Sequence, residues 1–181
     1  IGLVHEFAGA AAYANGDFAI ALRELQSHRR ITGSNEQIAL IVDCERGLGR
    51  PDKALAEGRA VDRRKISGEA RVNLAIALSG ARLDKGEDDL ALVELEIAEL
   101  TPTKVHDYSA ALFYAYSDVL ESLGRKSEAK KWADLAVRAE KEFAPKDTGG
   151  FEVVEEIQIP VRRGPSEYER NDGDGERPAR R

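Results

Sequence analysis

The 181-residue chain contains one cysteine, Cys44, and no methionine. A single cysteine excludes an internal disulfide and a zinc site built from several thiolates. No apolar run approaches the roughly 18 residues that a membrane-spanning helix needs, and no signal-peptide pattern is visible near Ile1. These absences predict a soluble, cytoplasmic protein that has no membrane partner. The lack of methionine, together with a helical pattern already present at Ile1, predicts further sequence upstream.

Aromatic residues are also scarce, and the chain has no excess of positive charge. Aromatics make up 6% of the chain, charged residues make up 33%, and the net charge is -6. This acidic balance argues against a wholly basic nucleic-acid-binding protein. The length suits either one compact domain or an elongated array of repeats.

Motifs for catalysis are missing as well. Cys44 lies between Asp43 and Glu45, whose carboxylates would raise the pKa of the thiol rather than activate it. The three histidines are scattered and lack the spacing of metal ligands. There is no glycine-rich phosphate loop, no Gly-x-Ser-x-Gly elbow and no His-Glu-x-x-His pattern. We therefore expect no enzyme activity, no metal and no cofactor.

What the chain does contain is a repeated turn. Four glycines are separated by 33, 37 and 38 residues, and each is followed five positions later by an alanine. The pairs are Gly16 and Ala21, Gly49 and Ala54, Gly86 and Ala91, and Gly124 and Ala129. Glycine ends a helix easily because it adopts left-handed φ values, and alanine allows two helices to cross closely. The spacing predicts four antiparallel helix pairs joined by these turns.

The segments on both sides of each glycine are amphipathic at helical spacing, with about 12 to 17 residues per predicted helix. Gly33, Ser67 and Pro102 are breaks between the pairs. The predicted units cover about residues 2–33, 35–66, 69–102 and 105–144, within a helical domain of residues 1–145.

This arrangement resembles the tetratricopeptide repeat, a helix–turn–helix unit of about 34 residues. The resemblance covers roughly residues 2–143, and the chain is also similar to small tetratricopeptide proteins of actinobacteria. It implies an all-α, right-handed solenoid of about four helix pairs. It also implies a concave face, lined by the first helix of each pair, that binds a peptide or helix of a partner.

The same resemblance implies which residues face this groove. The candidate contacts are Glu6, Tyr13, Asp43, Arg46, Asn73, Tyr114, Asp118 and Glu121. Five carboxylates and one arginine are expected on the face, since Glu36 adds to the acids in that set. The implied function is a non-catalytic scaffold for a protein or peptide, of basic or mixed charge. An ordinary solvated helix face would have the same acidic character, so that interpretation stays open.

Two alternative functions remain. The basic clusters at residues 28–30 and 63–65 are each expected at the end of a second helix, where they could bind phosphate or nucleic acid. Cations at helix ends also stabilise the terminal carbonyls, and we favour that structural role. The other alternative is self-assembly into a homo-oligomer, by stacking of terminal repeats between chains.

The chain changes character after Pro145. Residues 146–150 read as a linker, and residues 151–159 form a short, mixed apolar segment that either caps the last helix or docks on a partner. Residues 160–181 are rich in proline, glycine and charge, and we predict a disordered charged tail.

Overall fold

The structure is a computed structural model that describes residues 1–144. The predicted linker, apolar segment and tail lie outside the described residues. Within residues 1–144 the chain forms eight α-helices and one short 3-10 helix, with no strand, which confirms the predicted all-α class for this part. The elements are α1 (Gly2–Ala14), α2 (Phe18–Thr32), α3 (Ile38–Gly47), α4 (Pro51–Arg59), η1 (Arg63–Lys65), α5 (Gly68–Leu83), α6 (Asp88–Leu95), α7 (Ser109–Ser122) and α8 (Lys126–Phe143).

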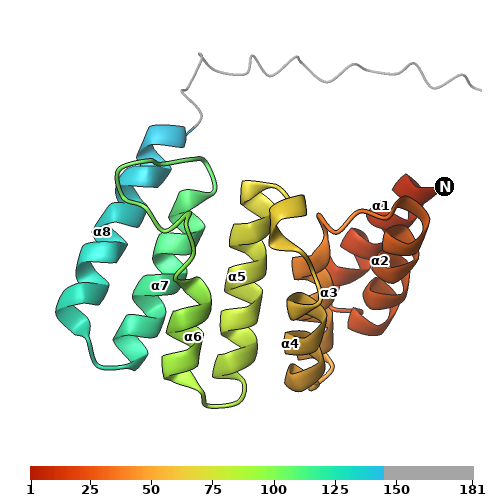
Figure 1. Ribbon diagram of the computed structural model, residues 1–181, viewed down its shortest axis with the longest axis horizontal. Helices are drawn as coiled ribbons and strands as arrows, with labels where there is room; N and C mark the ends of the chain where they lie inside the picture. The colour runs from red at the N-terminus through yellow and green to blue at the C-terminus, as the bar shows by residue number, and fades with distance from the viewer. Residues whose placement is uncertain (145–181) are drawn as a thin grey trace, which may run out of the picture. The chain divides into compact units, whose positions relative to one another are not determined.

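The helices pack as consecutive pairs that follow one another in chain order (Figure 1). Helices α1, α3, α5 and α7 contact one another in series and form one layer. The second helices form another layer, and each also packs on the first helix of the next pair: α2 on α3, α4 on α5 and α6 on α7. Every internal pair is therefore held by a pair on either side.

The turn inside each pair has the same backbone geometry. The four turn glycines have left-handed φ values of 79°, 71°, 70° and 75°. Each glycine N–H donates to the carbonyl three residues earlier at 2.8–2.9 Å. The N–H of the residue after each glycine donates to the carbonyl five residues before that residue, at 2.9 Å. This bond pattern satisfies the terminal carbonyls of the first helix and stops it at the same register in every pair.

The alanine that follows each turn is buried at the crossing of the two helices. Ala21, Ala54 and Ala91 have no exposed surface, and Ala129 has almost none. In each pair the alanine N–H donates to the carbonyl of the residue after the glycine, at 2.9–3.0 Å. The second helix therefore starts directly behind the turn, with its smallest side chain against the first helix.

Helix α4 is shorter than expected, with 9 residues. It ends at Arg59, so the basic cluster at residues 63–65 does not end a second helix but forms the separate 3-10 helix η1. Val61 and Ile66 on either side of η1 are buried in the core. Burial of these two side chains holds the connecting segment against the core, so the chain does not continue as a helix beyond α4.

Helix α6 is the shortest second helix, with 8 residues. It ends at Leu95, and the long connection that follows returns Ile97 and Leu100 to the core around Leu92 and Leu112. The apolar residues beyond Leu95 thus pack from a loop rather than from a continued helix. The general expectation of 12 to 17 residues per helix is wrong for α4 and α6, because loop side chains supply part of the core. It is also wrong for α3, which has 10 residues.

Candidate binding surface on the first helices

None of the eight candidate groove residues is buried. Asn73, Asp118 and Glu121 are exposed, and the other five are half-buried. They lie at equivalent positions of α1, α3, α5 and α7, which are 13, 10, 6 or 3 residues before the turn glycine. Since these helices form one layer, the candidate residues are distributed over that layer from the first pair to the last.

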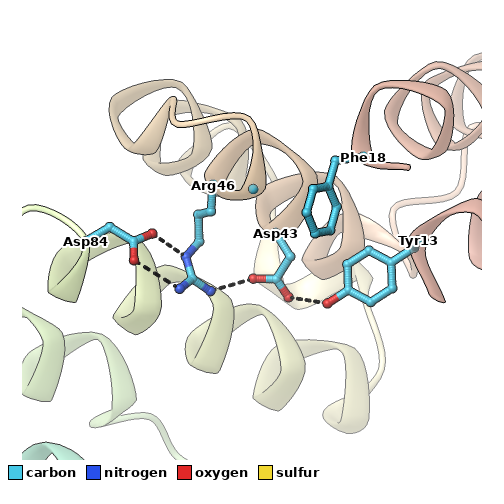
Figure 2. A pocket seen from close by; sticks show the side chains of 6 residues that line it. Tyr13, Phe18, Asp43, Arg46 and Asp84 are labelled. Carbon is cyan, nitrogen blue, oxygen red and sulfur yellow. Dashed lines mark hydrogen bonds and ion pairs between the residues drawn. The ribbon is translucent and has the colours of Figure 1, made fainter. Parts of the chain in front are cut away.

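Arg46 links two neighbouring first helices at the centre of this surface (Figure 2). Its Nη1 donates to Asp43 Oδ1 at 2.7 Å, within α3. Its Nε and Nη2 donate to Asp84 at 2.8 and 3.3 Å, just after α5. Burial of the guanidinium opposes its charge, but the hydrogen bonds to both carboxylates raise the pKa of Arg46. Two carboxylates therefore neutralise the single predicted groove cation.

A glycine makes this contact possible. The Arg46 guanidinium lies directly over Gly80, where a β-carbon would overlap it. Gly80 is one helical turn before Asp84, so the absent side chain opens the path along α5 by which the arginine reaches that carboxylate. Asp84 was assigned no role from the sequence. Asp84 is 38 residues from Arg46, and no local signal connects them.

Tyr13 and Phe18 complete the surroundings of this ion pair. The Tyr13 hydroxyl donates to Asp43 Oδ2 at 3.4 Å, and its ring meets the Phe18 ring edge-on at a centroid distance of 6.0 Å. Burial, followed by the Asp43 carboxylate, raises the pKa of Tyr13. The side chains enclose an open pocket of about 330 Å³ that Figure 2 shows from close by. The structure thus brings together three predicted groove residues, Tyr13, Asp43 and Arg46.

A second pocket lies between α3 and α5. It has a volume of about 320 Å³, and Asp43 lines both pockets. Ala39, Leu40 and Ile76 provide apolar surface, while the polar lining includes Asp43 and Asn73. This combination suits a side chain that has an apolar stem and a basic head.

Two other acids of the surface hold neighbouring repeats together. Glu6 Oε1 accepts a hydrogen bond from Gln37 Nε2 at 2.6 Å. Glu36 Oε2 accepts one from the Ser67 hydroxyl at 2.7 Å, at the start of α5. These carboxylates connect α1 to the segment just before α3, and that segment to the start of α5, so they contribute to stacking as well as to surface charge.

The fourth pair presents its acids differently. Asp118 and Glu121 are exposed on α7, and within residues 1–144 neither makes a side-chain hydrogen bond or ion pair. Tyr114, expected as a partner anchor, instead donates its hydroxyl to Glu140 Oε2 of α8 at 2.9 Å. That hydrogen bond raises the pKa of Tyr114. The acids of α7 are therefore available to a ligand, while Tyr114 already has a partner within the pair.

The basic clusters contain paired cations. Arg29 lies 3.1 Å from Glu57, and Arg63 lies 3.6 Å from Glu94. Arg64 pairs with Asp62 at 3.0 Å. These distances join side-chain nitrogen and carboxylate oxygen atoms. Ion pairing reduces the positive field that either cluster offers to phosphate.

Cys44 is fully buried, and the described residues show no catalytic arrangement around it. Burial, followed by the adjacent carboxylates Asp43 and Glu45, raises the pKa of the thiol to about 11. Among residues 1–144 no group of three or more His, Cys, Asp or Glu side chains is arranged to hold a metal ion. In the same range, no helix combines the length and apolar character needed to cross a bilayer.

Comparison of the chain with protein-family models and with curated proteins gave no match. A function for the first-helix surface therefore has to come from its own geometry and charge.

Proposed function

We propose that this chain is a tetratricopeptide-like, right-handed solenoid whose first helices bind a basic peptide or helix of a partner protein, without catalysis. The observation that carries the proposal is the surface of α1, α3, α5 and α7. Its arginine is neutralised by Asp43 and Asp84, while Asp118 and Glu121 remain exposed.

The repeat geometry supports the fold part of the proposal. All four turns share one hydrogen-bond pattern, and every second helix packs on the next first helix. Repeats that contact only their neighbours in this way form solenoids, and the layer of first helices provides an extended surface for ligands.

Charge supports the choice of a basic ligand. The five acidic side chains expected on this face are half-buried or exposed, and Asp84 adds a sixth carboxylate beside Arg46. A face of one sign attracts ligands of the opposite sign and speeds their association at low salt. The pocket that contains Asp43, Asn73 and Ile76 would accept a lysine or arginine side chain.

Selection of peptides from a random display library on the immobilised protein tests this proposal. Bound peptides should be net basic, and their affinity should fall as salt increases. Asp118→Lys with Glu121→Lys should weaken a selected peptide by about tenfold or more, because like charges then meet. Asp43 is unsuitable for this purpose, since its loss would also release Arg46.

The matched control is Asp89→Lys with Asp134→Lys, which makes the same charge change on exposed residues of α6 and α8. The control should bind the selected peptide like the wild type. Failure to enrich basic peptides, or equal weakening by both double variants, would contradict binding on the first helices.

A further inference from the structure

A cavity of about 340 Å³ lies between the start of α5 and the connection from α6 to α7. Gly68 and Arg71 of α5 line one side, and the other lining residues belong to residues 96–108, which form that connection (Figure 1). It is the longest connection between helices in residues 1–144. Long connections inside a compact domain are often functional. We call this space the loop cavity.

Arg71 is held so that one edge of its guanidinium remains free. Its Nε donates to Glu99 Oε1 at 2.6 Å, and its Nη1 donates to the Ile66 carbonyl at 2.8 Å. Within residues 1–144, Nη2 has no hydrogen-bond partner, and it lies 3.6 Å from the point where a β-carbon on Gly68 would stand. The two bonds therefore fix the guanidinium and leave the N–H donors of Nη2 unused.

Gly68 keeps the wall of the loop cavity open. A β-carbon there would stand 2.5 Å from the Tyr108 hydroxyl oxygen, so another residue would push the tyrosine aside. The Tyr108 ring stacks on His106, with centroids 5.0 Å apart and planes inclined by 13°. In the described part of the chain, neither the hydroxyl nor the imidazole has a side-chain hydrogen bond. Two further polar groups are thus positioned close to the free edge of Arg71.

The lining of the loop cavity has an excess of positive charge, unlike the first-helix surface. Glu99 is the one carboxylate among the lining residues, and its ion pair with Arg71 cancels one charge of each sign. Lys104 is exposed and, among residues 1–144, has no carboxylate partner. The ammonium group therefore adds a net positive charge next to the unused donors of Arg71 and Tyr108. Such a combination attracts an anion.

We propose that the loop cavity binds the phosphate monoester group of a small organic molecule. A phosphate monoester carries about -1.5 to -2 charges at pH 7 and has three strong acceptor oxygens. These oxygens match an ammonium, a guanidinium edge and a hydroxyl, which come from Lys104, Arg71 and Tyr108. A carboxylate has less charge and fewer oxygens to offer the same donors.

The size of the loop cavity favours an organic ligand over a bare ion. Its volume of about 340 Å³ lies in the lower part of the range of small-molecule sites, about 300–1,000 Å³. A single water molecule accounts for only about 30 Å³ of liquid volume. The part of the ligand beyond the phosphate would lie against Ala98 and the stacked rings of His106 and Tyr108.

This site is independent of the proposed peptide binding. The loop cavity shares no lining residue with the two pockets that contain Asp43, and its ligand has the opposite charge. Either proposal can therefore fail without the other.

Isothermal titration calorimetry of the full chain with ribose 5-phosphate, ribose and inorganic phosphate tests the proposal. Ribose 5-phosphate should bind, and ribose at the same concentrations should give no binding heat. Inorganic phosphate should bind at least about tenfold more weakly, because it leaves the apolar wall uncovered. The absence of binding by ribose 5-phosphate up to about 10 mM, or equal affinity for ribose, overturns the proposal. Equal affinity for inorganic phosphate would contradict an organic ligand.

The source of the phosphate group is tested with a short phosphoserine peptide and its unphosphorylated form. Tighter binding of ribose 5-phosphate than of the phosphopeptide supports a small molecule. The reverse order would overturn that part of the proposal and would assign the phosphate group to a partner protein.

Lys104→Glu should weaken ribose 5-phosphate by about tenfold or more, because a carboxylate then faces the phosphate. Tyr108→Phe retains the stacked ring and removes only the hydroxyl, so it should weaken binding by about threefold or more. Arg71 is unsuitable as a test, since its loss would leave Glu99 without a partner.

Lys130→Glu is the matched control, since it makes the same charge change on an exposed lysine of α8. It should bind ribose 5-phosphate like the wild type, and both lysine variants should keep the wild-type midpoint of urea unfolding. Equal weakening by Lys104→Glu and Lys130→Glu would show a response to net charge alone and would contradict a site in the loop cavity.

Amide chemical shifts of the ¹⁵N-labelled chain locate the ligand. Ribose 5-phosphate should cause its largest changes at Gly68, Thr101 and Lys104, and none at Asp118 of the first-helix surface. Largest changes at the basic clusters of residues 28–30 or 63–65 would place the phosphate elsewhere and overturn the assignment.

Discussion

Glu45 and Arg82 occupy equivalent positions in adjacent repeats, four residues before a turn glycine, and carry opposite charges. Each pairs with the residue just after its glycine, Glu45 with Arg50 at 3.0 Å and Arg82 with Glu87. The Glu45 side chain is fully buried, and its second oxygen lies 2.7 Å from Lys53 Nζ. The position thus accepts either charge when the turn supplies the opposite one.

The fourth repeat has Leu120 at the position of Glu45, which suggests a direct comparison. Glu45→Leu should leave the free energy of unfolding unchanged or raise it, because an apolar side chain avoids desolvation of a carboxylate. Arg50→Ala with Lys53→Ala should lower it by about 1–3 kcal/mol, since the buried carboxylate then lacks a partner and the two cations are half exposed to screening. Urea unfolding measures both. Equal losses in both variants would contradict this account.

The ion pair between Arg82 and Glu87 predicts that stability depends on pH. Hydrogen bonds from Arg82 and then Lys85 lower the pKa of Glu87 below 4.5. A carboxyl with a depressed pKa in the folded state stabilises at neutral pH and loses that contribution as the pH falls through the folded value. Wild type should therefore have a higher melting temperature than Glu87→Gln at pH 7, and the difference should shrink as the pH falls below the usual range of a glutamate carboxyl. A constant difference across this range would argue against the pair.

Gly80 and Arg46 should be energetically coupled. Arg46→Ala should lower the free energy of unfolding by about 1–2 kcal/mol in the wild-type background, because Asp43 and Asp84 lose their charged donor. Gly80→Ala displaces the guanidinium, so Arg46→Ala should cost much less in that background. A double-mutant cycle in urea measures the difference. Additive effects would show that the glycine does not determine how Arg46 reaches Asp84.

Cys44 should be inert in the folded protein. With its pKa near 11, about one thiol in a thousand is ionised at pH 8, and no part of the side chain is exposed. Reaction with a chromogenic thiol reagent should be at least about 100-fold slower than after unfolding in urea. Ala56→Cys in a Cys44→Ala background provides the exposed control. Comparable rates for the native Cys44 and this control would contradict its burial.

The turn glycines should tolerate asparagine better than alanine. Gly124 has a φ of 75°, and a β-carbon there would meet nothing within 4 Å, so any cost arises from the backbone alone. Gly124→Ala should lower the free energy of unfolding by about 1–2 kcal/mol, and Gly124→Asn by less, because asparagine adopts left-handed φ values more readily. Thermal or urea unfolding checks the order, and the reverse order would be evidence against a left-handed turn.

The two ends of the helix row illustrate how far a repeat pattern reaches. The sequence indicates that Ala11 and Lys130 belong to repeats, but their exposure follows from the position of each repeat in the row. Ala11 corresponds to the buried residues Cys44 and Ala81, yet nothing covers it in the described part of the chain. A repeat pattern alone assigns the same environment to equivalent positions, whereas the neighbouring repeats decide which of them are buried.

What the sequence determined by itself is the local architecture of residues 1–144. The recurrence of Gly16, Gly49, Gly86 and Gly124 marks left-handed turns, because such a φ value favours a residue without a β-carbon. The alanines that follow, and the helical spacing of apolar residues, predict an all-α chain for the same local reason.

Only the tertiary structure decided the lengths of α4 and α6 and the partners of the charged residues. Val61 and Ile97 take their segments out of the helical path because the core of adjacent pairs offers them burial. Arg46 and Asp84 meet across 38 residues because stacking brings α3 beside α5 and Gly80 leaves room between them. Ion pairs depend on distances of about 3 Å between side chains, and those distances exist only after the repeats have stacked.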